Sequence, residues 1–159
     1  MTAAFHVATG PTRLHGRPMD RLERTHRAWL DELRTAVVHA DAGESGIWPR
    51  WKAIRSLDTF LMDHFDRERK AMESLGPRIG GNGVRQLWAA GELVEALRWQ
   101  LRHATGLCHR ADEFSTITGK LLRAVEYWFA AVEDVVRSVE WNDLPAGVRE
   151  VIAAEASQQ

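Results

Sequence analysis

His64 and Glu68 are the two residues whose types and spacing most strongly suggest chemistry. They are four positions apart, so a helix places them one above the other on a single face. The same face carries Leu57, Leu61 and Met72, and this spacing predicts that an imidazole and a carboxylate are buried together. Because an unpaired buried charge is costly, the two groups need compensation. Either they form an internally satisfied His–Glu pair, or both bind one metal ion.

Helical periodicity of apolar residues predicts the elements that position this pair. Segments with two or more glycines separate the first three predicted helices. No segment alternates with period two over a useful length, so we expect an all-α chain. We predict an N-terminal arm over 1–16 and a helical domain over 17–156. The predicted helices of this domain span 18–40, 49–75, 84–102 and 115–139, with a short C-terminal helix after 142. This order predicts an up-down-up-down four-helix bundle. Residues 105–116 either continue the third helix or form a loop.

Two motifs resemble the hemerythrin-like (HHE cation-binding) family. The run Asp63-His64-Phe65-x-x-Glu68-x-x-x-Met72 is similar to the family's His-Phe-x-x-Glu signature. The segment from His15 to His26 looks like its first helix, with His26 at a ligand position. The resemblance covers about residues 13 to 150 and implies an antiparallel four-helix bundle that holds two iron atoms.

The resemblance also implies that half of the family's metal site is degenerate. His26, His64 and Glu68 match the family pattern, and Glu133 matches a carboxylate five positions after a fourth-helix histidine. That histidine is Trp128 here. Ala90 and Val94 stand where a third-helix His-x-x-x-His pair is expected.

All ligands of one iron are thus retained and those of the other are replaced. We therefore predict one ion rather than two, bound by His26, His64, Glu68 and Glu133, with Trp128 filling the vacated half. Iron is expected, and manganese or zinc also suits such ligands.

The register of the third helix leaves one alternative open. With a shifted register, His103 becomes a ligand and Trp99-x-x-x-His103 a half-lost pair. Otherwise His103, His15, His39 and His109 are expected at the surface or at helix ends.

Composition excludes several partner classes. The net charge is −1 without a basic tract, which disfavours nucleic acid. No run is long and apolar enough to span a bilayer, so no membrane partner is expected. A single cysteine and an N-terminus unlike a signal peptide suggest a cytoplasmic protein. Seven tryptophans are unusual for this length, and we expect most of them to fill the core.

The most direct functional hypothesis is a metal-binding protein whose ion keeps a position open for a small ligand such as oxygen or nitric oxide. One alternative is a non-haem metal enzyme that acts on a small organic substrate in a Trp-lined pocket. Another is a metal-free bundle that serves as a regulatory or partner-binding module. The sequence does not decide whether the protein is an enzyme or a carrier, and it does not decide the oligomeric state.

Overall fold

The computed structural model describes residues 16–42, 46–76 and 79–155, and every regular element in these ranges is helical. This confirms the all-α class. Residues 1–15 of the predicted arm and residue 156 lie outside the described ranges. The α-helices are α1 (Gly16–Asp41), α2 (Ile47–Phe60), α3 (Asp66–Glu73), α4 (Gly81–His103), α5 (Ala111–Ser138) and α6 (Ala146–Glu155). A π-helix, η2 (Leu61–Phe65), joins α2 to α3, and short 3₁₀ turns lie at η4 (Leu107–His109) and η5 (Trp141–Asp143).

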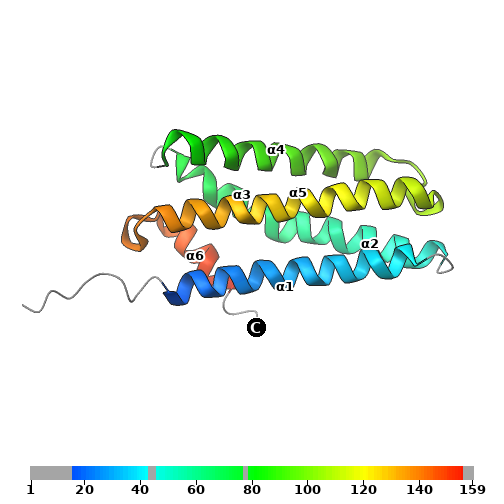
Figure 1. The fold of residues 1–159 in the computed structure, drawn as a ribbon, viewed down its shortest axis with the longest axis horizontal. Coiled ribbons are helices and arrows are strands. Elements are labelled where there is room, and N and C mark those ends of the chain that lie inside the picture. Colours follow the sequence, from blue (N-terminus) through cyan, green and yellow to red (C-terminus); the bar gives the residue numbers. More distant parts are fainter. Residues whose placement is uncertain (1–15, 43–45, 77–78, 156–159) are drawn as a thin grey trace, which may run out of the picture.

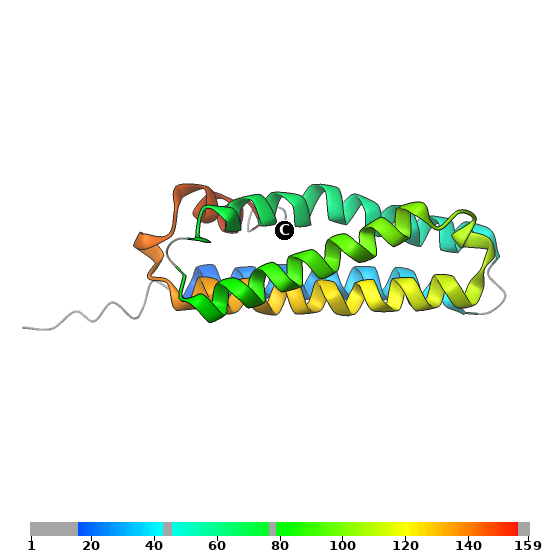
Figure 2. The same cartoon turned by 90° about the horizontal axis from the view of Figure 1, so that it is seen from above.

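The long helices run side by side along the length of the molecule (Figure 1). α5 packs against both α1 and α4, and α1 also packs against α2. α6 contacts α1 and α3 at one end, while η4 contacts the start of α2 at the other. Seen from above, α4 crosses obliquely over the pair formed by α1 and α5 (Figure 2). A side chain that points inward from any long helix therefore meets side chains from its neighbours.

The apolar stripes predicted from the sequence form the core. On α4 the five predicted inward positions are all buried, namely Leu87, Ala90, Val94, Leu97 and Leu101. On α5 the stripe is buried from Ile117 to Val135, and only Val139 at its end is partly exposed. The agreement confirms which face of each helix is buried.

The predicted second helix is interrupted where the motif begins. A continuous helix was expected over 49–75, but residues 61–65 form a π-helix. Two adjacent buried pairs, Phe60 with Leu61 and His64 with Phe65, lie at its ends. A π-turn takes one extra residue and rotates the chain that follows, so neighbours in sequence can both point inward. Such bulges are frequent at functional sites, and this one carries His64.

The sequence left undecided whether residues 105–116 continue the third helix or form a loop. In the structure α4 ends at His103 and does not continue through them. Gly106 has φ +68°, a conformation that favours glycine, and η4 follows it before α5 starts at Ala111. Cys108 is partly buried and His109 is exposed.

The expectation that most tryptophans fill the core is wrong. Trp128 is fully buried, whereas Trp29, Trp88 and Trp141 are only partly so. Trp48, Trp51 and Trp99 are 71%, 43% and 62% exposed. Trp48 and Trp51 lie on the first two turns of α2, at the end of the molecule, where few neighbours can cover them. Within the described ranges, no helix has the length and apolar character needed to cross a membrane.

Candidate metal centre

Three of the predicted ligands converge inside the helices. His26 comes from α1, His64 from η2 and Glu68 from the first turn of α3. One ligand atom from each lies within 4.8 Å of the other two. The three residues are 1%, 7% and 1% exposed, so the group is almost completely removed from solvent. This group, found among the residues that the structure describes, is compact enough to hold one metal ion.

Glu68 is bonded through both of its oxygens, but not to the partner expected from the sequence. Its Oε1 accepts a hydrogen bond from His26 Nε2 at 2.9 Å. Its Oε2 accepts one from the indole N–H of Trp128 at 2.5 Å. His64 Nε2 lies 3.9 Å from Oε1, which is too long for a hydrogen bond. His64 and Glu68 thus lie within ion-pair distance rather than sharing a direct hydrogen bond, and the hydrogen bonds of the carboxylate go to α1 and α5.

Glu133 reaches the site from the opposite side of His26. Its Oε1 lies 2.7 Å from His26 Nδ1, and its side chain is 22% exposed. An imidazole that donates to carboxylates from both nitrogens carries two protons and a positive charge. If Nε2 gives up its proton to bind an ion, Nδ1–H can stay on Glu133, which then orients the ring. The structure thus brings Glu133 to the site, but behind His26 and outside the group of converging ligand atoms.

The protonation equilibria at this site favour the forms that bind metals. Burial opposes a charged Glu68. However, the charge and hydrogen bond of His26, with help from His64 and Trp128, lower the pKa of this carboxyl below its ordinary value. Burial lowers the pKa of His64 and outweighs the attraction of Glu68. Coordination requires an ionised carboxylate and a neutral imidazole. The lowered pKa values favour these forms of Glu68 and His64, whereas His26 must release the proton on Nε2 before it can bind an ion.

Aromatic rings enclose the two imidazoles. The ring of His26 stacks on Phe129, with centroids 3.9 Å apart and an interplanar angle of 9°. The ring of His64 stacks on Phe60 at 5.3 Å, and Trp29 lies 5.7 Å from it. Such packing fixes the orientation of both rings and keeps the space around them apolar.

Trp128 points inward, as predicted, and is 0% exposed. Its ring lies edge-on to Phe65 at 5.1 Å and comes close to α4 at Gly91. A Cβ at Gly91 would lie 3.2 Å from Trp128 Cζ3, so glycine leaves the space that the indole occupies. Gly91 was not among the residues predicted to matter, although a glycine within a long helical pattern can mark a close approach of another element.

The other histidines that the structure describes, together with Glu92 and Glu95, lie away from the site. His103 is exposed, stacks on Trp99 at 4.4 Å and has its Nδ1 2.8 Å from the Trp99 carbonyl oxygen, so it is not a ligand here. His39 and His109 are exposed, as expected, and His15 lies outside the described residues. Glu92 and Glu95 pair with Arg69 between α3 and α4.

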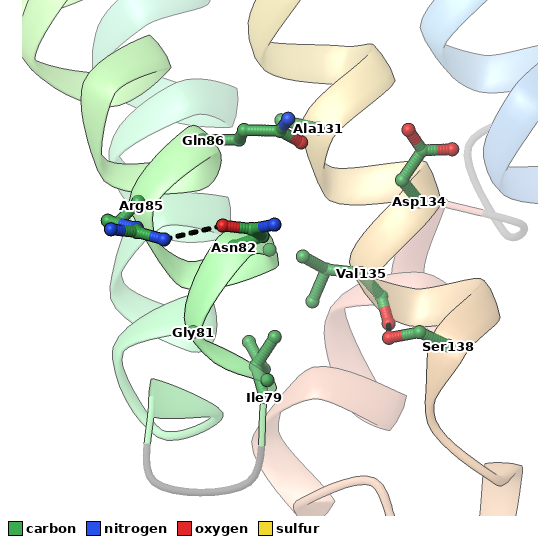
Figure 3. A pocket seen from close by; sticks show the side chains of 11 residues that line it. Ile79, Gly81, Asn82, Arg85, Gln86, Ala131, Asp134, Val135 and Ser138 are labelled. Atoms are coloured by element: carbon green, nitrogen blue, oxygen red, sulfur yellow. Dashed lines mark hydrogen bonds between the residues drawn. The ribbon is translucent and has the colours of Figure 1, made fainter.

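Two pockets bear on access and binding. A groove of about 430 Å³ between α1 and α5 reaches His26, Phe129 and Glu133. A pocket of about 600 Å³ lies apart from the site, between the start of α4 and the end of α5 (Figure 3). Glycine backbone on α4 and Asp134 and Ser138 on α5 line this second pocket. Tryptophan lines neither of them, so neither is the Trp-lined substrate pocket considered from the sequence.

Comparison of the chain with known protein families, with curated proteins and with solved structures found no match. Function must therefore be argued from the site itself.

Proposed function

We propose that this protein binds one divalent metal ion, most suitably iron, through His26, His64 and Glu68. We further propose that the chain is a four-helix bundle of the hemerythrin-like kind with a short C-terminal helix. The observation that carries the proposal is the convergence of two imidazoles and a carboxylate in a buried space. His64 and Glu68 both have pKa values shifted toward the forms that coordinate.

The spacing of the ligand atoms suits a single ion. Two atoms bound about 2.1 Å from one ion at a right angle lie about 3.0 Å apart, and atoms at wider angles lie up to about 4.2 Å apart. The observed separations from Glu68 Oε1 are 2.9 Å to His26 Nε2 and 3.9 Å to His64 Nε2. Two imidazoles and one carboxylate suit Fe(II), Mn(II) and Zn(II).

Trp128 argues against a second ion. A bridging carboxylate would need both oxygens for metals, but Glu68 Oε2 accepts the indole N–H. The space next to it is filled by a fully buried ring. An indole N–H can only donate, so Trp128 cannot replace a histidine ligand. The site is therefore proposed to hold one ion.

Three protein ligands leave at least one coordination position for a small exogenous ligand. Phe60, Phe129 and Trp29 make the surroundings apolar and tight. A small uncharged ligand such as oxygen or nitric oxide fits this space better than a bulky or strongly hydrated one. The proposed role is a metal-dependent sensor or carrier. The residues that line the two pockets do not favour an enzyme that acts on a larger organic substrate.

A metal-free bundle is the second candidate, and one observation favours it. His26 is held between Glu68 and Glu133 at 2.9 and 2.7 Å, distances at which hydrogen bonds satisfy all three groups without an ion. Charge-assisted hydrogen bonds of this kind stabilise a buried cluster. The two candidates therefore differ in whether an ion displaces the proton on His26 Nε2.

Metal loading of the purified chain separates the candidates. After anaerobic incubation with Fe(II) and removal of excess ion, we expect one metal atom per chain by elemental analysis. Glu68→Gln and His64→Leu should lose it, whereas His103→Ala, at an exposed histidine, should keep it. A chelator should lower the melting temperatures of the loaded wild type and of His103→Ala, and leave those of Glu68→Gln and His64→Leu unchanged. If all four proteins carry only trace metal and melt alike with and without chelator, the metal-free bundle is correct.

A further inference from the structure

The first turns of α2 present an uncovered aromatic surface. Ile47, Trp48 and Trp51 are 43%, 71% and 43% exposed. The two indoles contact each other edge to face at 5.8 Å. They lie at the end of the molecule where α2 begins and where η4 joins α4 to α5 (Figures 1 and 2). Large exposed aromatic residues grouped in this way mark interaction surfaces.

The charged residues beside these indoles on α2 are all basic. Between residues 46 and 57 every charged side chain is basic, namely Arg50, Lys52 and Arg55, although the whole chain carries a net charge of −1. The guanidinium of Arg55 lies 5.2 Å above the Trp51 ring. Arg50 donates to the Cys108 carbonyl at 3.1 Å and ties this end of α2 to η4.

The helix end itself adds to the positive potential. The N-terminus of α2 has no acidic residue in its first turn and no side-chain cap. Within the described residues of α2 and its N-cap, no side chain offsets the partial positive charge of the helix dipole. Indoles beside a positive surface are complementary to one kind of partner, an apolar layer covered by anionic groups.

We propose that Ile47, Trp48, Trp51, Lys52 and Arg55, here called the tryptophan patch, bind the surface of a membrane that contains anionic phospholipid. Indole rings favour the boundary between headgroups and acyl chains. Lysine and arginine near the surface are attracted by anionic headgroups. The attachment is peripheral, since none of the described helices can cross a bilayer. No membrane partner was expected from the sequence, because it has no segment that could span a bilayer. The exposure of these indoles could not be read from the sequence and is seen only in the structure.

The tryptophan patch is independent of the proposed metal site. The patch residues lie between nine positions (Arg55) and seventeen positions (Ile47) before His64, which corresponds to about 13–25 Å along a helix at about 1.5 Å per residue. Membrane binding can therefore be measured on the metal-free protein. A failure of metal loading would not contradict membrane binding, and a failure of membrane binding would not contradict metal loading.

The test is co-sedimentation of the full chain with phosphatidylcholine vesicles, with and without phosphatidylglycerol. We expect binding only to the anionic vesicles, and weaker binding as salt rises. Trp48→Ala with Trp51→Ala should abolish it, and Trp48→Ala alone should weaken it. Lys52→Ala should weaken it about fivefold, the loss expected for one basic residue near the surface. Trp99→Ala is the matched control, because Trp99 is 62% exposed, between the values for Trp51 and Trp48, but lies on α4.

Three results would overturn the proposal. The first is no binding to anionic vesicles at low salt. The second is equal binding by the double variant and by Trp99→Ala, with both proteins showing the wild-type melting temperature. The third is a dimer in light scattering without vesicles that the double variant loses. This last result would assign the tryptophan patch to a second copy of the chain.

Discussion

Replacing Trp128 by phenylalanine isolates the hydrogen bond that the indole makes to Glu68 Oε2. The substitution keeps a six-membered ring in the buried space beside Phe65 and Gly91. It removes the N–H, and a hydrogen bond to a charged group contributes about 1.5–3 kcal/mol. The missing part of the indole leaves a cavity of roughly 40 Å³, which costs about 1 kcal/mol at about 24 cal/mol per Å³. We therefore expect a loss of about 3 kcal/mol, a large share of a typical domain's stability of about 5–15 kcal/mol.

The assay is urea unfolding of the metal-free protein, with Trp29→Phe as the matched control. Trp29 also lies near the site, 5.7 Å from His64, but its indole does not donate to Glu68. The control should therefore cost about 1 kcal/mol or less, from the smaller ring alone. Because the Trp128 hydrogen bond helps to lower the pKa of Glu68, its loss should also move acid unfolding to higher pH. Equal costs for the two variants, with an unchanged acid midpoint, would show that the indole only fills space.

Three further predictions concern pH, packing and charge. His64 has a lowered pKa, so the folded chain binds this proton more weakly than the unfolded chain does. Stability should begin to fall as pH drops below about 6.5, the ordinary value, and it should fall more steeply in wild type than in His64→Leu when unfolding is measured from pH 7.5 to 5. Gly91→Ala should destabilise by about 1 kcal/mol or more, because its Cβ meets the buried Trp128 ring. Gly119→Ala, with open space on α5, should stabilise by up to about 1 kcal/mol in the same melting assay. Arg98→Lys should cost about 1 kcal/mol in urea by losing the two-point contact to Asp66, whereas Arg137→Lys at an exposed pair should cost less than about half of that.

The helical class and most buried positions could be predicted because a 3.6-residue period is local information. Leu87, Val94 and Leu101 on α4 repeat at that period, and the burial of one follows from the burial of the others. His26 and Glu68 were likewise predictable as inward residues, since each lies on an apolar stripe.

The partners of these residues could not be predicted in the same way. Which carboxylate faces which imidazole nitrogen depends on how α1, α3 and α5 pack, and on the π-turn that rotates His64 relative to α2. One local signal was present and overlooked. Phe129 and Glu133 are four residues apart on α5, and both contact the ring of His26. Trp128 and Glu133 are five apart and so point about 140° away from each other around the helix, which is why they reach different sides of the site.

The charges at the site provide a final argument about the number of ions. When both nitrogens of His26 donate to the carboxylates of Glu68 and Glu133, the metal-free site carries one net negative charge. The lowered pKa of His64 favours its neutral form, so His64 adds no charge to this sum. One divalent ion that displaces the Nε2 proton of His26 brings the sum to zero, whereas two divalent ions would leave two positive charges in an apolar space. A buried cluster is least costly when its charges balance, so one ion is the favoured load. Binding at pH 7 should then release one proton per ion, measurable by calorimetry in buffers of different ionisation enthalpy. Metal binding without proton release would mean that the His26–Glu68 hydrogen bond stays intact and that the ion lies elsewhere.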